Sequence, residues 1–286
     1  MTRLDEATWR ALEAAHEQRV DAWTGPVLDR ARRREKHPVE DFLFTYYSHR
    51  PGRLRRWSPG PGVVLEGREP DQHWEAVPDG ELPGGAVLGG VPPKVDARAR
   101  WVVALSAAVA SRPPRFGCSG LHEWAMVYRQ DPAEVRHAQL PLRLGAAGTA
   151  AVVEELPLTC THFDAFRFFT PEAVPRNSAQ LDRDGRLDHE QGGCLHANMD
   201  LYAHAAALWP WVASDLVADC FELARRVRVL DMRASPYDVS GLGLSAIAVE
   251  TVDGRRDYAE QQRAFAAEAA VLRERLVAAA RRLPAA

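Results

Sequence analysis

The chain of 286 residues has little lysine and no long apolar run. Its basic residues are arginines apart from Lys36 and Lys94. The longest apolar run, around Trp101–Ala110, is shorter than the roughly 20 residues that a membrane helix needs, so we expect no membrane partner. The first ten residues carry Asp5 and Glu6 and lack the apolar core of a signal peptide. We therefore expect a cytoplasmic protein.

Paired cysteines and the common linear signatures of catalysis are also missing. Cys118, Cys160, Cys194 and Cys220 are far apart in the sequence, and without an export signal we expect each to be a reduced thiol buried as a small side chain. The sequence has no phosphate-binding Gly-rich loop, no Gly-x-Ser-x-Gly turn and no His-Glu-x-x-His pair. It also lacks the His-x-Glu and Pro-Cys-x-x-Cys signature of zinc deaminases.

The overall composition is that of an ordinary globular chain, with 46% hydrophobic and 26% charged residues. The formal net charge of −3 disfavours a protein that covers nucleic acid with its whole surface, but it permits a local basic patch. The length suffices for a large core without disulfides. We expect a single domain over residues 1–286.

Hydrophobic periodicity predicts an α+β fold that is predominantly α-helical, with a single core and a few short strands. The Gly25-Pro26 pair is expected to break or kink the first helix. The Gly/Pro-rich segment 58–93 is expected to be irregular, with one or two edge strands packed on the domain. Helices are predicted at 3–35, 96–111, 121–130 and 257–283, and over 196–229 with an interruption near Trp209-Pro210-Trp211; strands are predicted at 138–144, 149–155 and 244–251.

Charged residues alternate with phenylalanines in the string THFDAFRFFTPEAVPRN, residues 161–177. His162, Asp164 and Arg167 must pair internally or face a wet pocket, because an unpaired buried charge is costly. The string therefore predicts either an Asp–Arg pair that holds a loop or a binding or catalytic pocket.

A second polar string, CLHANMDLYAH at residues 194–204, places His196, Asp200 and His204 on one helical face. The two histidines would lie roughly 12 Å apart along the helix axis, so the three residues cannot all bind one ion. Two of them can supply ligands for zinc, iron or manganese, with others from His162, Asp164, Glu123 or His122. The alternative is capping and core hydrogen bonding.

Two further strings carry clustered charge. LDMRASPYD, residues 230–238, places Asp231, Arg233 and Asp238 in an expected turn, either as a clamp or as the rim of the same pocket. The stretch 30–57 contains nine basic and three acidic residues, which suits a phosphate-binding, base-stacking surface, a site for a small anion or a solvated surface. The candidates for nucleic-acid or anion binding are Arg50, Arg53, Arg55, Arg56 and Trp57.

These strings, together with HPVEDFLFTYYSHRPGRLRRW at residues 37–57, resemble a family of bacterial proteins, mainly actinobacterial, that carries the name 3-methyladenine DNA glycosylase. The resemblance covers nearly the whole chain. It implies base excision from DNA that contains alkylated purines, with DNA as partner and no required cofactor.

Base excision passes through an oxocarbenium-like sugar that a carboxylate must stabilise, and aromatic rings recognise a cationic alkylated base. Asp164 or Asp200 would be that carboxylate, and His162 or His196 would position the water. The residues expected to bind the substrate are Phe166, Arg167, Phe168, Tyr202, Trp209 and Arg233.

Two other functions fit the same residues. The first is a metal-dependent enzyme with zinc or non-haem iron that acts on a small molecule, with ligands drawn from His162, Asp164, His196, Asp200, Glu123 and His204. The second is a non-catalytic binding protein whose arginines hold an anionic ligand. Metal content separates the metal-dependent enzyme from the other two functions, and base release from methylated DNA identifies the glycosylase.

Overall fold

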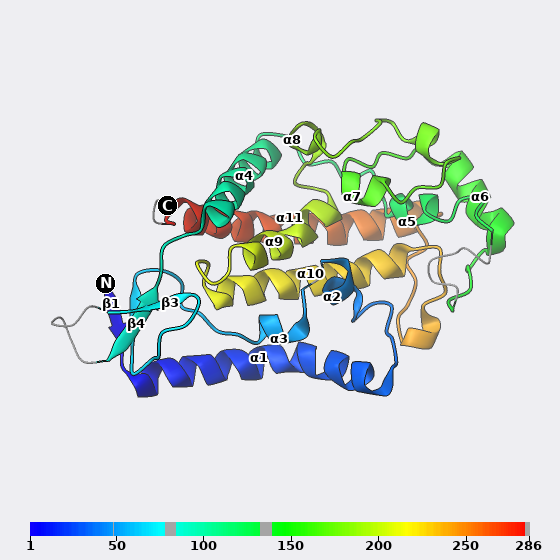
Figure 1. Cartoon of the computed structure of the whole chain (residues 1–286). Helices are drawn as coiled ribbons and strands as arrows, with labels where there is room; N and C mark the ends of the chain where they lie inside the picture. Colours follow the sequence, from blue (N-terminus) through cyan, green and yellow to red (C-terminus); the bar gives the residue numbers. More distant parts are fainter. Residues whose placement is uncertain (48, 78–83, 132–138, 284–286) are drawn as a thin grey trace. The chain divides into compact units, whose positions relative to one another are not determined.

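The structure is a computed structural model that describes residues 1–47, 49–77, 84–131 and 139–283. These residues form eleven α-helices, α1 to α11, two short 3-10 helices and one four-stranded sheet (Figure 1). This confirms the predicted, mostly helical α+β fold. Among the helices of the described residues, none has both the length and the apolar character required to cross a membrane.

The chain divides into two compact units, each assembled from separate stretches of sequence. Unit 1 consists of Met1–Ala104, Leu201–Glu222 and Leu272–Ala286, and unit 2 consists of Leu105–Asp200 and Leu223–Val271. The single domain expected over residues 1–286 stays a prediction.

Unit 1 begins with the long helix α1 (Glu6–Arg33). Asp5 caps it, because its Oδ1 accepts a hydrogen bond from the Thr8 N–H at 2.8 Å. The helix continues through Pro26, so the break expected there is wrong. Val20 and Val27, which precede and follow Pro26 in the helix, are buried, and burial of an apolar helix face offsets the hydrogen bond that proline removes.

The sheet of unit 1 has the strand order β1-β2-β4-β3. Its strands are β1 (Thr2–Leu4), β2 (Val63–Glu66), β3 (Trp74–Ala76) and β4 (Gly85–Leu88). β1 is parallel to β2, and the other pairs are antiparallel. The segment 58–93 thus supplies three strands rather than one or two, and the first residues of the chain pair with them instead of extending α1.

Tryptophans anchor the core beside this sheet. Trp9, Trp57, Trp74 and Trp211 are buried in one cluster with Leu65 and neighbouring apolar side chains. The buried indole N–H groups find backbone acceptors: Trp9 donates to the Glu66 carbonyl at 2.8 Å, and Trp211 donates to the Gly89 carbonyl at 3.0 Å.

Two short helices of unit 1, α2 (Phe42–Tyr46) and α3 (Pro51–Leu54), precede the sheet strand β2. His16 Nε2 of α1 lies 2.9 Å from the Leu54 carbonyl, which ties α3 to α1. Ser58 donates from its backbone to Ser214 Oγ at 2.9 Å and from its hydroxyl to the Pro210 carbonyl at 2.8 Å. These bonds fix the chain that leaves α3.

Unit 2 contains the short helices α5 (Leu121–Ala125), α7 (Phe163–Phe166) and α8 (Arg186–His189), the longer α6 (Gly145–Glu155), and the 3-10 helices η1 (Val174–Arg176) and η2 (Ser240–Leu242). The strand predicted at 149–155 is wrong, because these residues lie in α6. Its buried Thr149, Val152 and Val153 form an apolar run that suits a strand or a helix equally.

The other two predicted strands are also wrong. Residue 138 lies outside the described residues, and the remainder of 138–144 makes only an isolated bridge, from Leu142 to Tyr237. The segment 244–251 is irregular. Its backbone bonds to other segments instead of to a ladder, as when the Ile247 N–H donates to the Arg233 carbonyl at 2.7 Å.

The four remaining helices were all predicted, with bounds that differ by a few residues. They are α4 (Pro93–Ala110), α9 (Leu195–Ala207), α10 (Ser214–Ala234) and α11 (Val252–Arg281). Trp209-Pro210-Trp211 separates α9 from α10, as expected. The helix predicted at 121–130 is shorter, because α5 ends at Ala125.

Candidate functional site

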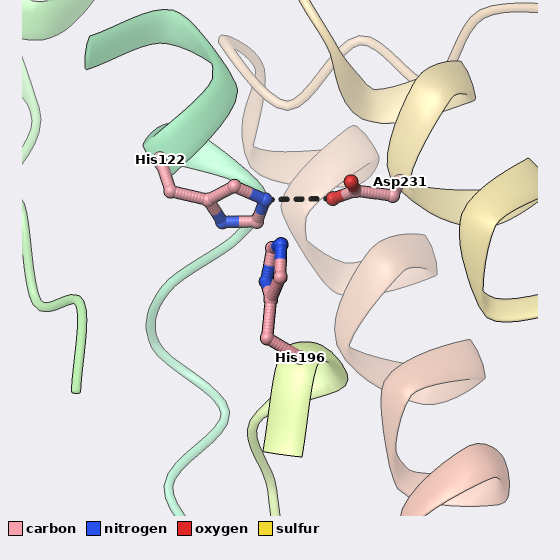
Figure 2. Close-up of side chains that lie close together, drawn as sticks. All are labelled: His122, His196 and Asp231. Carbon is pink, nitrogen blue, oxygen red and sulfur yellow. Dashed lines mark hydrogen bonds and ion pairs between the residues drawn. The ribbon is translucent and has the colours of Figure 1, made fainter. Parts of the chain in front are cut away.

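Three side chains from different helices meet in unit 2: His122 of α5, His196 of α9 and Asp231 of α10. His122 Nε2 lies 2.7 Å from Asp231 Oδ1, and the ring of His196 points toward this hydrogen bond (Figure 2). One ligand atom from each of the three lies within 4.8 Å of the other two, and all three side chains are buried. We refer to these residues as the His122 group.

A close contact between α5 and the end of α10 places His122 opposite Asp231. Gly120, just before α5, has a φ of 72°, a conformation that favours glycine. A Cβ at Gly120 would lie 3.0 Å from the Ala234 Cβ, so glycine also permits the close approach. The Trp124 indole N–H then donates to the Ala234 carbonyl at 2.8 Å and fixes α5 in place.

The start of α9, which carries His196, is held in a similar way. Gly193 lies so close to Arg115 that a Cβ there would stand 2.4 Å from the Arg115 carbonyl oxygen. The buried Gln262 side chain of α11 donates to the Gly193 carbonyl at 2.6 Å. These two contacts position the first turn of α9, and with it His196.

The charged side chains around the His122 group are buried and form ion pairs. Arg228 donates to Asp231 Oδ2 at 3.0 Å and to Glu123 Oε1 at 2.7 Å. Burial opposes protonation of His122, but the Asp231 carboxylate outweighs it and raises the pKa of His122 well above its usual value. The pKa of Asp231 is correspondingly low despite burial, because His122 lies against it. Without a metal, the pair is therefore a protonated His122 that donates to an ionised Asp231 carboxylate.

His196 differs from His122 in its protonation state. Its ring meets that of His122 edge-on, with centroids 4.6 Å apart. Burial, followed by the positive charge of His122, lowers the pKa of His196 to about 3. The imidazole is therefore neutral at physiological pH and keeps a nitrogen lone pair for a metal ion or a proton.

A second cluster lies next to the first and consists of His162, Asp164 and Asp200, which also offer ligand atoms within 4.8 Å of one another. We refer to it as the His162 group. His162 Nε2 lies 3.3 Å from Asp200 Oδ2, and its Nδ1 lies 3.5 Å from Glu190 Oε1. The rings of His162 and His196 have centroids 5.4 Å apart, so the two groups are adjacent.

Arg186 neutralises the carboxylates of the His162 group. Its guanidinium contacts Asp200 at 2.7 Å, Asp164 at 3.8 Å and Glu190 through Nε. Burial raises the pKa of Glu190 to about 7, against the opposing charge of Arg186. Glu190 is therefore poised to gain or lose a proton near neutral pH.

The structure divides the residues that the sequence suggested as metal ligands. His162, Asp164 and Asp200 come together, whereas His196 lies with His122 and Asp231. Glu123 contacts Arg228, which also binds Asp231. His204 is placed in unit 1, where Arg98 contacts its Nδ1 at 3.1 Å and Trp101 packs against its ring. The six expected ligands do not form one set.

The residues expected to bind the substrate also lie in different parts of the structure. Asp164 pairs with Arg167 at 3.1 Å, and Arg167 stacks over Phe168. Phe166 is buried. Asp231 and Arg233 were expected in a turn, but both lie in the last turn of α10, which continues to Ala234.

In unit 1, Arg53 and Arg56 line a pocket together with Tyr202 and Trp209. Arg55 instead faces Asp21 at 3.5 Å, Arg50 is exposed, and Trp57 is buried in the core. The pocket thus gathers four of the residues that were expected to bind an anion or a ring.

Sequence reasoning missed the centre of the site, the His122–Asp231 pair. It named His122 only as a possible additional ligand, and it placed Asp231 in a turn, either in a clamp or at the rim of a pocket. It also missed Glu190, Arg186 and Arg228, and it treated Cys118, whose Sγ lies 3.5 Å from His122 Nδ1, as a packing residue. The spacing Arg228-x-x-Asp231 was the available signal, since it puts both charges on one helical face.

Comparison with known proteins adds no assignment. No model of a protein family matches the chain, and no match is found among curated proteins or among solved structures.

Proposed function

We propose that the protein is a metal-dependent enzyme in which His122, His196 and Asp231 hold a divalent ion. The observation that carries the proposal is the convergence of one ligand atom from each of these buried side chains within 4.8 Å. Two histidines and one carboxylate form the donor set of many catalytic zinc and non-haem iron sites. Such a set leaves coordination positions for water and substrate.

The chemistry of the three donors suits an ion. His196 is neutral, and Asp231 is ionised. His122 Nε2 and Asp231 Oδ1 are 2.7 Å apart, somewhat closer than two ligands on one tetrahedral ion with bonds of about 2.0 Å. An ion held by these residues would have to displace the proton of His122, and His122 and Asp231 would have to move slightly apart to hold it.

The neighbouring residues support catalysis rather than a purely structural role. A bound ion would act as a Lewis acid and lower the pKa of a coordinated water. The His162–Glu190 contact, adjacent to His196, offers a proton acceptor whose pKa is about 7. Such a group suits general acid–base catalysis at neutral pH. Zinc would favour hydrolysis of a small molecule, and iron would favour its oxidation.

The test begins with protein purified without chelator, whose metal content per chain is measured by elemental analysis. The same protein is then stripped and titrated with Co²⁺, whose visible absorption reports its ligands. We expect one ion per chain and at least tenfold weaker Co²⁺ binding in His196→Ala and Asp231→Asn. His189→Ala, outside both groups, is the control and should bind Co²⁺ normally. Absence of both native metal and a Co²⁺ spectrum refutes the proposal.

Base excision from alkylated DNA, which the family resemblance implies, is the second candidate. The observation that favours it is Asp164, a carboxylate with 30% of its side chain exposed in the phenylalanine-rich string. Asp200 suits this role less, because it is buried and already bonded to Arg186. The test is release of 3-methyladenine from methylated duplex DNA by chelator-treated protein. Base excision predicts activity that Asp164→Asn removes, and an inactive wild type excludes this function.

A further inference from the structure

Cys118 contacts the His122 ring at the nitrogen that Asp231 does not use. Its Sγ is 3.5 Å from His122 Nδ1, and the other ring nitrogen, Nε2, is 2.7 Å from Asp231 Oδ1. The three side chains are thus connected in the order thiol, imidazole, carboxylate. This is the order of nucleophile, base and orienting group in enzymes that work through a covalent intermediate.

A tight turn after Cys118 brings the thiol beside the imidazole. The Leu121 N–H donates to the Cys118 carbonyl at 2.9 Å. The two residues between them, Ser119 and Gly120, have φ values of 50° and 72°, and two consecutive positive values belong to a turn of type I′. Ser119, although not a glycine, is held in this strained backbone conformation, which recurs beside functional sites. The chain therefore reverses directly after Cys118, and His122 in the first turn of α5 meets the sulfur.

The imidazole offers the sulfur a positively charged donor. Burial lowers the pKa of His122, but the Asp231 carboxylate outweighs burial and raises it well above its usual value, so His122 is protonated in the metal-free protein. A protonated imidazole carries a hydrogen on both nitrogens. Nε2–H therefore donates to Asp231, and Nδ1–H donates to Cys118. The thiolate rather than the thiol is the nucleophile, and a cationic donor stabilises it.

The other cysteines differ from Cys118 in burial or in this contact. Burial raises the pKa of Cys220 to about 12 and that of Cys160 well above its usual value, so both thiols stay protonated at neutral pH. Cys194 is half-buried, as Cys118 is, and the hydrogen bond to His122 distinguishes Cys118 from it. Cys194 is therefore a matched internal control.

We propose that Cys118 is the nucleophile of a thiol–imidazole–carboxylate triad that accepts the acyl group of a small ester or thioester. The sulfur attacks the carbonyl carbon, His122 gives its Nδ1 proton to the leaving group, and the bond from carbon to the leaving group breaks. The product is an acyl thioester on Cys118. Water then attacks this thioester, passes a proton to Nδ1 and releases the acid and the thiolate. Asp231 is a positioning residue, because it holds the ring through Nε2.

This activity belongs to the metal-free protein and goes beyond the proposed metal-dependent function. The proposed ion would be held on Nε2, and it would take Asp231 from the hydrogen bond that orients the ring. The sulfur contacts the opposite nitrogen, so chelator-treated protein tests the triad alone. A negative result there leaves the Co²⁺ titration of the metal site as a separate test.

The first experiment mixes chelator-treated, full-length protein with p-nitrophenyl acetate. We expect a rapid release of about one equivalent of p-nitrophenol per chain, as an acyl-enzyme forms. After an acid quench, mass spectrometry of the digested protein should locate the acetyl group on Cys118. Absence of an acetyl group on Cys118, or an equal extent of acetylation on Cys194, overturns the proposal.

The second experiment measures the nucleophilicity of the sulfur by alkylation with iodoacetamide. Cys118 should react about tenfold or more faster than Cys194 in the same protein, since a cationic donor activates only the first thiol. Equal rates at the two residues overturn the proposal. This comparison uses the wild-type protein and is independent of the folding of any variant.

Variants then test the role of the imidazole. His122→Gln should slow both acetylation and alkylation of Cys118 about tenfold or more, and Cys118→Ser should remove the rapid release of p-nitrophenol. Cys194→Ser is the control and should leave the release unchanged. Unchanged rates in a folded His122→Gln protein overturn the proposal. If circular dichroism shows that this variant is unfolded, the comparison of Cys118 with Cys194 in wild type decides.

Discussion

His122 and Asp231 are 109 residues apart in the sequence, yet Nε2 of one and Oδ1 of the other are 2.7 Å apart in the interior of unit 2. The contact joins a five-residue helix to the end of a long one. Arg228 binds the other oxygen of Asp231, so the carboxylate has two cationic partners. This pair is the point on which the metal proposal and its consequences depend.

Metal binding should be strongly dependent on pH. Asp231 raises the pKa of His122 well above 6.5, so at neutral pH an ion must displace a proton from His122. Affinity for Co²⁺ should therefore increase as pH rises, by up to about tenfold per pH unit, until the pKa of His122 is passed. Titrations between about pH 6 and about pH 8 measure this slope. An affinity that is flat over this range would contradict proton displacement.

Replacing Asp231 by Asn should destabilise the protein. The change removes the carboxylate that pairs with His122 and one of the two carboxylates that pair with Arg228, and breaking a buried pair typically costs about 3–5 kcal/mol. Denaturant unfolding of the metal-free protein measures the loss. Asp253→Asn is the control, because the exposed Asp253–Arg256 pair should contribute less than about 1 kcal/mol. Similar stability of the two variants would show that the buried network contributes little.

Glu190 should make the protein less stable as pH rises toward neutrality. Burial raises its folded pKa from 4.5 to about 7, so the folded state holds a proton that the unfolded state releases. This contribution is fully present below the unfolded pKa and is lost as pH rises through the folded value. In Glu190→Gln, the fall in the free energy of unfolding over that interval should diminish. Glu172→Gln, an exposed site, should retain the wild-type profile.

Cys118 should tune the affinity of His122 for an ion. Its Sγ lies 3.5 Å from Nδ1, the nitrogen opposite the proposed ligand atom. Outer partners of a metal-binding histidine orient its ring, and their loss commonly costs about tenfold or more in affinity. We expect this loss in Cys118→Ala, measured by Co²⁺ titration. Cys220→Ala, in unit 1, should leave affinity unchanged, and equal affinities in all three proteins would refute a role for the thiol.

The sequence by itself determined the helical character of the fold. Apolar periodicity located α4, α9, α10 and α11, and Trp209-Pro210-Trp211 marked the boundary between α9 and α10. Both signals are local, because the helical spacing of apolar residues and the effect of proline on a helix depend on residues that are close in the sequence. The strands predicted from short apolar runs at 149–155 and 244–251 were wrong, since the conformation of such a run depends on the part of the protein that packs against it.

Sequence also found most of the polar groups of the site but not their partners. It treated His162, Asp164, His196 and Asp200 as one candidate ligand set, with Glu123 and His204 as further members. Only the tertiary structure could place His196 beside His122 and Asp231. That arrangement depends on how closely α5 approaches α10 and on which turn of α9 faces them. Those are properties of long-range packing, which no local spacing encodes.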